Sequence, residues 1–188
     1  NHSHSHDYLT KFTFQKFVED IEESIKIFKN KLGYNPIYFS YPFGEYNLEQ
    51  KNYISNNFEF AFGQHSGVID LNKDRYELPR FPINEKYGEI KRFKEVISYL
   101  PLQYRIIKPE NKFMNDGENP PKMTIEFFED QKNLENINCF SNEGSKWRKT
   151  KIVLIDNILN VYFSEKFIER RGRINCSLKD ENGWRFSG

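Results

Sequence analysis

The feature that most constrains the fold is a change of hydrophobic pattern near residue 108. Before it, apolar residues recur every three to four positions in long runs, and these runs alternate with short, continuous apolar stretches. After it, only short strand-like stretches occur, separated by turn residues at intervals of roughly ten positions. The chain has 188 residues, which is long enough for this change to mark two domains.

The first long run predicts an amphipathic helix. Thr13 is placed to cap its start and Gly33 to end it, while Asp20 and its acidic neighbours fall on the solvent side. A second helix is expected after Asn47, because Gln50 three positions later completes a capping box. The apolar stripe of the first helix consists of Phe14, Phe17, Val18, Ile21, Ile25, Phe28 and Leu32.

Short strands separate the predicted helices. They are PIYFS at 36–40, FEFAFG at 58–63 and an extended piece, YELPRFPI, at 76–83, followed by a helix at 88–100. Strand and helix in alternation predict parallel strands joined by crossover helices. The later short stretches predict a β-sandwich. The sequence thus predicts an α/β domain at 1–107, a linker at 108–121 and a β-sandwich domain at 122–188.

Composition argues against two classes of partner. Apolar residues make up 37% and charged residues 29% of the chain, and the formal net charge is only +1. No basic stripe stands out, which does not favour binding to a nucleic-acid backbone. No apolar stretch reaches the roughly 18 residues that a membrane span needs. No signal peptide is visible, and the compartment stays open.

The only cysteines, Cys139 and Cys176, each lie in an Ile-Asn-Cys triplet. They lack the close spacing of a zinc site. The sequence favours two buried free thiols, with a disulfide as the alternative.

The first six residues, NHSHSH, carry three of the four histidines. His2 and His6 lie four positions apart, so on a helical turn they share one face and can share a metal ion, while His4 points away. Imidazole nitrogen suits Zn²⁺ and other late divalent ions. The pair alone is incomplete, since a catalytic zinc usually has three protein ligands and a water. A metal site, a solvated segment and the remnant of a tag all remain open at this point.

Residues 1–47 carry several motifs in a definite order. The histidines precede the amphipathic helix, which ends in LGYNP, and YFSYPFGEYN follows. This arrangement resembles the polysaccharide deacetylase family, whose catalytic unit is the NodB-homology domain. In that family a His-(Ser/Thr)-x-x-His motif supplies two metal ligands, and His2, Ser3 and His6 match it. The later Pro-aromatic-Gly turn of the family matches the Pro-Phe-Gly at 42–44.

The resemblance extends beyond these motifs and implies a fold. LPRFPI at 78–83 is similar to the segment that closes the active-site groove in some members, and residues 170–186 are similar to a β-sandwich appended to others. We therefore expect a partial, distorted (β/α) barrel over 1–107 and an immunoglobulin-like sandwich over 122–188. We also expect the chain to be truncated at both ends. Family members suggest a secreted or cell-envelope location.

The resemblance also implies an activity, the metal-dependent hydrolysis of N-acetyl or O-acetyl groups on a carbohydrate. His2 and His6 would hold a divalent metal, most readily Zn²⁺, and the backbone N–H of Phe43 would stabilise the oxyanion. Tyr41 and Phe43 would offer ring faces to a sugar, with core packing as the alternative. Arg80 would pair with a buried carboxylate, with a surface ion pair as the alternative.

The chain also departs from the family pattern. The Thr-Phe-Asp-Asp motif, which supplies the third ligand and the catalytic base, does not occur in it. Ser40 stands where many members have an arginine, and the late Leu-x-His motif has no clean match. His65 is a candidate general acid, although a polar loop histidine is the simpler reading. A catalytically decayed carbohydrate-binding or structural module is the main alternative function, and a zinc-binding regulatory domain is a third.

Overall fold

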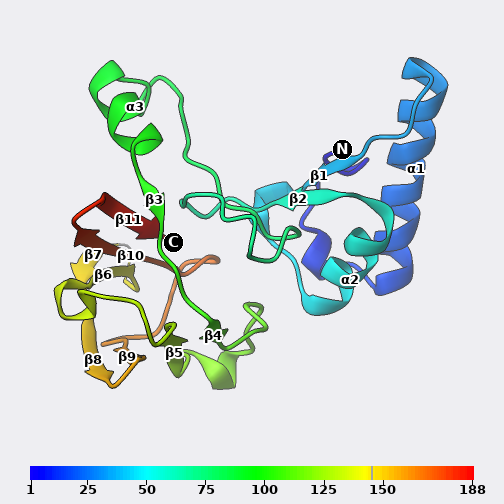
Figure 1. Ribbon diagram of the computed structural model, residues 1–188. Helices are drawn as coiled ribbons and strands as arrows, with labels where there is room; N and C mark the ends of the chain where they lie inside the picture. Colours follow the sequence, from blue (N-terminus) through cyan, green and yellow to red (C-terminus); the bar gives the residue numbers. More distant parts are fainter. Residues whose placement is uncertain (145) are drawn as a thin grey trace. The chain divides into compact units, whose positions relative to one another are not determined.

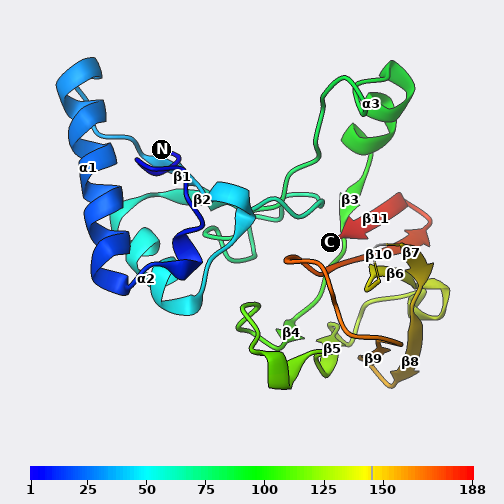
Figure 2. The same cartoon turned by 180° about the vertical axis from the view of Figure 1, so that it is seen from behind.

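The computed structural model describes residues 1–144 and 146–188, which form two compact units (Figure 1). The N-terminal unit comprises residues 1–65 and 69–80. The C-terminal unit comprises residues 66–68 and 81–188. Figure 2 shows the same ribbon from behind. Each unit has its own hydrophobic core and is described separately.

The N-terminal unit begins with the helix that the sequence predicts. Helix α1 (Phe14–Leu32) starts where the Thr13 side chain accepts a hydrogen bond from the N–H of Lys16, at 3.3 Å. It ends at Gly33, whose φ of 81° is left-handed and therefore favours a residue without Cβ. The predicted helix and both of its end signals are confirmed.

Helix α2 (Leu48–Asn57) carries the predicted capping box. The Asn47 side chain accepts from the N–H of Gln50 at 2.8 Å, and the Gln50 side-chain oxygen accepts from the N–H of Asn47 at 3.2 Å. Gln50 is buried and also donates from Nε2 to the carbonyl oxygen of Leu9, at 2.8 Å. The same side chain thus starts α2 and ties it to the segment that follows the histidines.

The sheet of the N-terminal unit is open and parallel. Strands β1 (Tyr38–Ser40) and β2 (Phe60–Phe62) pair in parallel, and Leu78 adds a parallel bridge to Phe62. On the other side of β1, the nitrogen of Asn1 donates to the carbonyl oxygen of Tyr38 at 2.7 Å, and Ser40 N–H donates to the oxygen of Asn1 at 2.9 Å. This is the bonding pattern of a parallel neighbour. Within residues 1–144 and 146–188 no sheet closes into a barrel.

The core of this unit lies between one face of the sheet and the two helices. Side chains alternate along the strands, so that Phe39 and Ala61 face inward. They pack against the predicted stripe of α1 and against Ile54 of α2. The fully buried members of the stripe are Phe17 and Ile21.

The C-terminal unit contains two sheets that share one core. All strand pairs are antiparallel except β3 with β11. The five-stranded sheet has the order β3 (Leu100–Pro101), β11 (Gly183–Ser187), β10 (Arg173–Asp180), β6 (Asn138–Asn142) and β7 (Trp147–Lys149). The four-stranded sheet has the order β4 (Ile106–Lys108), β5 (Met123–Glu126), β9 (Ile158–Tyr162) and β8 (Lys151–Ile155). Ile125, Leu159 and Leu178, from both sheets, lie in a single buried cluster. The finer expectation of an immunoglobulin-like topology stays a prediction.

The remaining helices are short. They are α3 (Ile90–Ile97) and the 3-10 turns η1 (Leu9–Lys11), η2 (Pro42–Gly44), η3 (Asp116–Glu118) and η4 (Leu134–Asn136). No helix in the described part of the chain is long and apolar enough to cross a membrane.

The compact units divide the chain elsewhere than at the predicted boundary between residues 107 and 108. Helix α3 and strands β3 and β4 belong to the C-terminal unit, although the pattern of the sequence places them in the first domain. The reason is long-range pairing: β3 pairs with β11, and β4 pairs with β5. Local periodicity carries no information about such partners.

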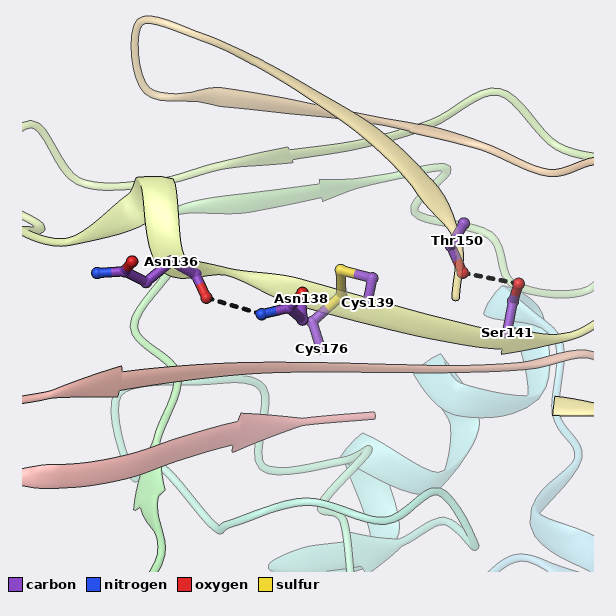
Figure 3. The surroundings of a disulfide bond; sticks show 6 residues. All are labelled: Asn136, Asn138, Cys139, Ser141, Thr150 and Cys176. Atoms are coloured by element: carbon purple, nitrogen blue, oxygen red, sulfur yellow. Dashed lines mark hydrogen bonds between the residues drawn. A yellow bond between two sulfur atoms is a disulfide. The ribbon is translucent and has the colours of Figure 1, made fainter. Parts of the chain in front are cut away.

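The two cysteines form a disulfide, so the prediction of free thiols is wrong (Figure 3). Cys139 on β6 and Cys176 on β10 lie directly opposite each other in the antiparallel pair, with Cα atoms 4.1 Å apart. Both side chains face the core between the sheets. The sequence separation of 37 residues conceals that the two strands are neighbours.

Candidate functional site

The predicted site residues gather along one edge of the parallel sheet. His2 follows the Asn1 segment, and Phe43 follows β1. His65 follows β2, and Arg80 follows the Leu78 bridge. These four parallel segments therefore present the residues at their carboxyl ends. In open α/β sheets, ligands bind at this end of the strands.

The structure brings the rings of His2 and His6 together. Their centroids lie 4.8 Å apart with an interplanar angle of 64°. The reasoning from a helical turn is nevertheless wrong, because residues 2–6 (the histidine loop) form a bend rather than a helix. Ser3 and His6 take left-handed φ values of 65° and 54°, and Ser3 Oγ accepts a hydrogen bond from the His6 N–H at 3.0 Å. The bend, and not helical periodicity, pairs the rings.

The His2 ring is oriented by β1. Its Nδ1 lies 2.6 Å from the carbonyl oxygen of Ser40. A carbonyl oxygen only accepts, so Nδ1 carries the proton, and in a neutral ring Nε2 keeps the lone pair that can bind a metal. Metal-binding histidines commonly have this arrangement. Ser40, which stands where many members of the resembled family have an arginine, makes this contact through its backbone.

The spacing of the two rings suits a shared ion. Two imidazoles that bind one tetrahedral Zn²⁺, at about 2.0–2.1 Å each, hold their ring centres roughly 5 Å apart. The observed 4.8 Å agrees with that value. Among the residues that the structure describes, no group of three or more His, Cys, Asp or Glu side chains is arranged to hold a metal ion. This part of the chain therefore brings together two histidine rings, and their role as metal ligands remains a prediction.

The Pro-Phe-Gly turn is fixed by close backbone approach. A Cβ at Gly44, whose φ is 69°, would lie 2.6 Å from the backbone nitrogen of Gln64, so only glycine fits there without a shift. Phe43 itself has a φ of 58°. Its ring stacks on Tyr8 at 4.2 Å and meets the His6 ring edge-on at 5.0 Å. The turn thus places an aromatic ring directly against the histidine pair.

Tyr41 belongs to the core and not to the open edge. It is 1% exposed, its ring lies 4.5 Å from that of Tyr46, and its hydroxyl donates to the carbonyl oxygen of Tyr76 at 3.1 Å. Burial, and then the carboxylates of Asp74 and Glu77, raise the pKa of the Tyr41 hydroxyl, which therefore remains a donor. The burial of Tyr41 favours the alternative of core packing over a sugar contact.

A polar network behind the turn escaped the sequence analysis. Lys51 Nζ lies 2.7 Å from Asp74 Oδ2 and 3.4 Å from Glu77 Oε2, and the Tyr46 hydroxyl donates to the same Glu77 oxygen at 2.8 Å. Desolvation lowers the pKa of Lys51, but the two carboxylates outweigh it and the pKa is raised overall. The members lie far apart in the sequence, so no local signal links them.

His65 and Arg80 are joined through the backbone. The Arg80 N–H donates to the carbonyl oxygen of His65 at 3.0 Å, just after the carboxyl end of β2. The His65 ring lies over Gly63, where a Cβ would meet its Nδ1 at 2.8 Å. Arg80 is exposed and His65 half-buried. Both residues follow parallel segments of the sheet, and their roles remain predictions.

Asp20, which the sequence did not indicate as a site residue, holds the histidine loop. Asp20 of α1 accepts hydrogen bonds from the backbone N–H groups of His4, at 2.9 Å, and Ser5, at 3.0 Å. The pattern of the sequence places Asp20 on the solvent side of the helix, and nothing local indicates its contact with the loop.

Comparison with known proteins identifies the N-terminal segment. Residues 1–60 match the family model described as polysaccharide deacetylase. The predicted family resemblance is confirmed. The polysaccharide deacetylase match contains the histidine pair and the Pro-Phe-Gly turn, and it ends before His65 and Arg80. No curated protein and no solved structure matches the chain.

Proposed function

We propose that this chain carries the metal-binding histidines of a metal-dependent polysaccharide deacetylase, which hydrolyses N-acetyl or O-acetyl groups on a carbohydrate. One observation carries the proposal. Within the segment that matches the family, His2 and His6 present two rings 4.8 Å apart, and a backbone carbonyl fixes the tautomer of His2.

A bound divalent ion, most readily Zn²⁺, would polarise the acetyl carbonyl and lower the pKa of its water toward about 7. His2 and His6 would hold it as neutral imidazoles. The Ser40 carbonyl would fix the tautomer and orientation of the His2 ring, so that Nε2 faces the ion. The Phe43 ring would restrict the His6 ring through their edge contact.

The Pro-Phe-Gly turn would contribute the backbone N–H of Phe43 to the oxyanion. What supports this role is the rigidity of the turn, since the contact between Gly44 and Gln64 fixes its backbone. A preorganised donor stabilises developing charge without reorganising during the reaction.

Arg80 and His65 would contribute side chains at the carboxyl ends of the same parallel segments. Arg80 would pair with a carboxylate of the enzyme or its substrate, and His65 would act as a general acid. Their support is position alone, since both follow segments of the same parallel sheet. For the C-terminal unit we propose an immunoglobulin-like sandwich. The disulfide joins β6 and β10, neighbouring strands of one sheet, and supports an oxidising compartment, such as the cell envelope or the medium.

A specific observation favours the alternative of a decayed carbohydrate-binding module. The described residues bring together only two metal ligands, and Ser40 replaces the arginine of the family. In that case the edge would bind acetylated sugar chains without turnover.

Acetate release separates the two functions. The native full-length protein is incubated with N-acetylated and O-acetylated oligosaccharides. The incubation is repeated after a chelator is added, and again after Zn²⁺ is added back. We expect acetate release that the chelator abolishes and Zn²⁺ restores, and that His2→Ala or His6→Ala removes. His4→Ala is the matched control and should retain release. Chelator-insensitive release, or a metal-loaded protein that binds the sugars without releasing acetate, would contradict the deacetylase.

A further inference from the structure

The histidine loop is attached to α1 by one carboxylate. Asp20 Oδ2 accepts from the N–H of His4 at 2.9 Å, and Asp20 Oδ1 accepts from the N–H of Ser5 at 3.0 Å. The two N–H groups are consecutive and lie midway between the ring-bearing residues His2 and His6. Each oxygen serves one N–H, so the side chain must have two acceptors at once.

The loop needs such an anchor because its backbone is strained. Ser3 and His6 both hold left-handed φ values, which non-glycine residues keep only where the surroundings over-determine them. Besides Asp20, Ser3 Oγ bonds to the His6 N–H, and Asn1 Oδ1 accepts from the Ser3 N–H at 2.9 Å. Those two bonds lie within residues 1–6. Asp20 is the contact that fixes the middle of the loop to a helix.

A second side chain of α1 holds the start of the loop. Ser24, one helical turn after Asp20, donates from its hydroxyl to Asn1 Oδ1 at 3.0 Å. Asn1 also pairs with β1. The loop is therefore fixed at its start by Ser24 and the sheet, and in its middle by Asp20. His6 comes directly after the two residues that Asp20 holds, and its own N–H and ring contact Ser3 and Phe43.

We propose that Asp20 is a positioning residue that pairs the rings of His2 and His6 before any ion binds. Asp20 is not a third ligand in this arrangement, since no group of three or more His, Cys, Asp or Glu side chains among the described residues is placed to hold an ion. Its two oxygens accept backbone N–H groups of the loop instead. The purpose of the pairing rests on the proposed function. The pairing itself is a property of the metal-free chain, and it can be tested without activity.

The test compares three variants of the chain. Asp20→Asn keeps the shape but leaves one oxygen for two donors, and its NH₂ group faces one of them. Asp20→Ala removes both acceptors yet favours the helix, so a loss of loop order cannot be attributed to a weaker α1. Glu23→Gln is the matched control, because it removes one charge from the same helix at a side chain that pairs with Lys26, at 3.2 Å.

Two measurements are made on the metal-free protein by NMR. They are the amide exchange rates of His4 and Ser5 and the nuclear Overhauser contacts between the rings of His2 and His6. A third measurement is the affinity for Zn²⁺, with the absorption of bound Co²⁺ as a report of ligand geometry. We expect exchange to accelerate at least tenfold and the ring contacts to fade in both Asp20 variants. Zn²⁺ affinity should fall by about 10–100-fold, as it does for other groups that orient metal ligands.

Each outcome decides the proposal. Unchanged exchange and ring contacts in Asp20→Ala would overturn it, and so would equal changes in Glu23→Gln, which would indicate a general charge effect. If the wild-type chain binds no Zn²⁺ but the Asp20 variants lose the ring contacts, the positioning role stands and the proposed metal site fails.

Discussion

Two carboxylates in this molecule make the same kind of contact in different surroundings. Asp20 accepts from the consecutive N–H groups of His4 and Ser5, and Glu143 accepts from those of Ser164 and Glu165, both at 2.9 Å. Asp20 is only partly covered, whereas Glu143 is 0% exposed. Asp20 uses one oxygen for each N–H, whereas Glu143 Oε2 accepts both N–H groups and its Oε1 accepts from the Ser141 hydroxyl. The access of water to the two carboxylates also differs.

The surroundings decide what each contact stabilises. Around Glu143 no water can replace a lost partner, so its removal leaves buried donors unsatisfied and destabilises the whole unit. Around Asp20, water can solvate the freed N–H groups, so its removal releases the loop while α1 persists. A carboxylate that accepts backbone N–H groups therefore stabilises the whole unit where it is buried, and it orders only its own loop where it is partly exposed to solvent.

The largest expected effect on the free energy of unfolding concerns the disulfide of the C-terminal unit. Replacing both Cys139 and Cys176 by alanine removes a closed loop of 37 residues, which should cost about 4 kcal/mol of unfolding free energy. Both tryptophans, Trp147 and Trp184, lie in this unit, so urea unfolding followed by their fluorescence measures it selectively. A change within experimental error would show that the disulfide does not stabilise the unit.

The next effect tests the buried carboxylate itself. Glu143→Ala leaves the N–H groups of Ser164 and Glu165 and the Ser141 hydroxyl without their acceptor, and it should cost about 3 kcal/mol or more. Glu143→Gln should cost clearly less, because its amide oxygen can still accept from both N–H groups while its nitrogen donates to Ser141.

Urea unfolding with tryptophan fluorescence again provides the measurement for the Glu143 pair. Glu165→Gln, which removes a carboxylate in an exposed ion pair with Arg148, serves as control and should have little effect. Equal losses in Glu143→Ala and Glu143→Gln would contradict the hydrogen-bond account.

The smallest effect concerns a third carboxylate of this kind, in the β10–β11 hairpin. Asp180 accepts from the N–H groups of Asn182, at 2.8 Å, and Gly183, at 3.1 Å, and from Arg185. The hydrogen bond from Arg185, helped by those N–H groups, lowers the pKa of Asp180. A lowered folded-state pKa means that the ionised group stabilises above its unfolded pKa of about 3.9 and loses this contribution as pH falls through the folded value.

Asp180→Asn should therefore reduce stability by about 1 kcal/mol at neutral pH, the typical net contribution of one hydrogen bond, because Asn keeps an acceptor oxygen but loses the charge. The difference from the wild type should vanish in acid, below the folded pKa of Asp180. Unfolding free energies measured from pH 2 to pH 7 for both proteins provide the test. A difference that does not change with pH would assign the effect to packing.

The local elements of the fold could be predicted because their determinants are near in sequence. Thr13 and Gly33 bound α1, and Asn47 with Gln50 starts α2. The pairing of Cys139 with Cys176 could not be predicted, because it depends on β6 and β10 becoming neighbours. The grouping of β3 and β4 with the C-terminal unit depends on long-range partners in the same way.

The candidate site was only partly accessible from the sequence. His2 and His6 were found through their spacing, although a bend built on Ser3, and not a helical turn, brings them together. Tyr41 was proposed from its residue type, yet alternation along the chain turns it into the core. Asp20 carries no signal in its neighbours, because its partners lie 15 and 16 positions away.

We propose that His2 and His6 form a metal site within the segment that matches the polysaccharide deacetylase family. Its most direct test is a Zn²⁺ titration of the chain by calorimetry, comparing His2→Ala and His6→Ala with His4→Ala. We predict one ion per chain, at least about tenfold weaker binding in the first two variants, in keeping with the loss of a ligand, and wild-type binding in the third. Equal losses at all three positions, or binding that survives both His2→Ala and His6→Ala, would contradict the account.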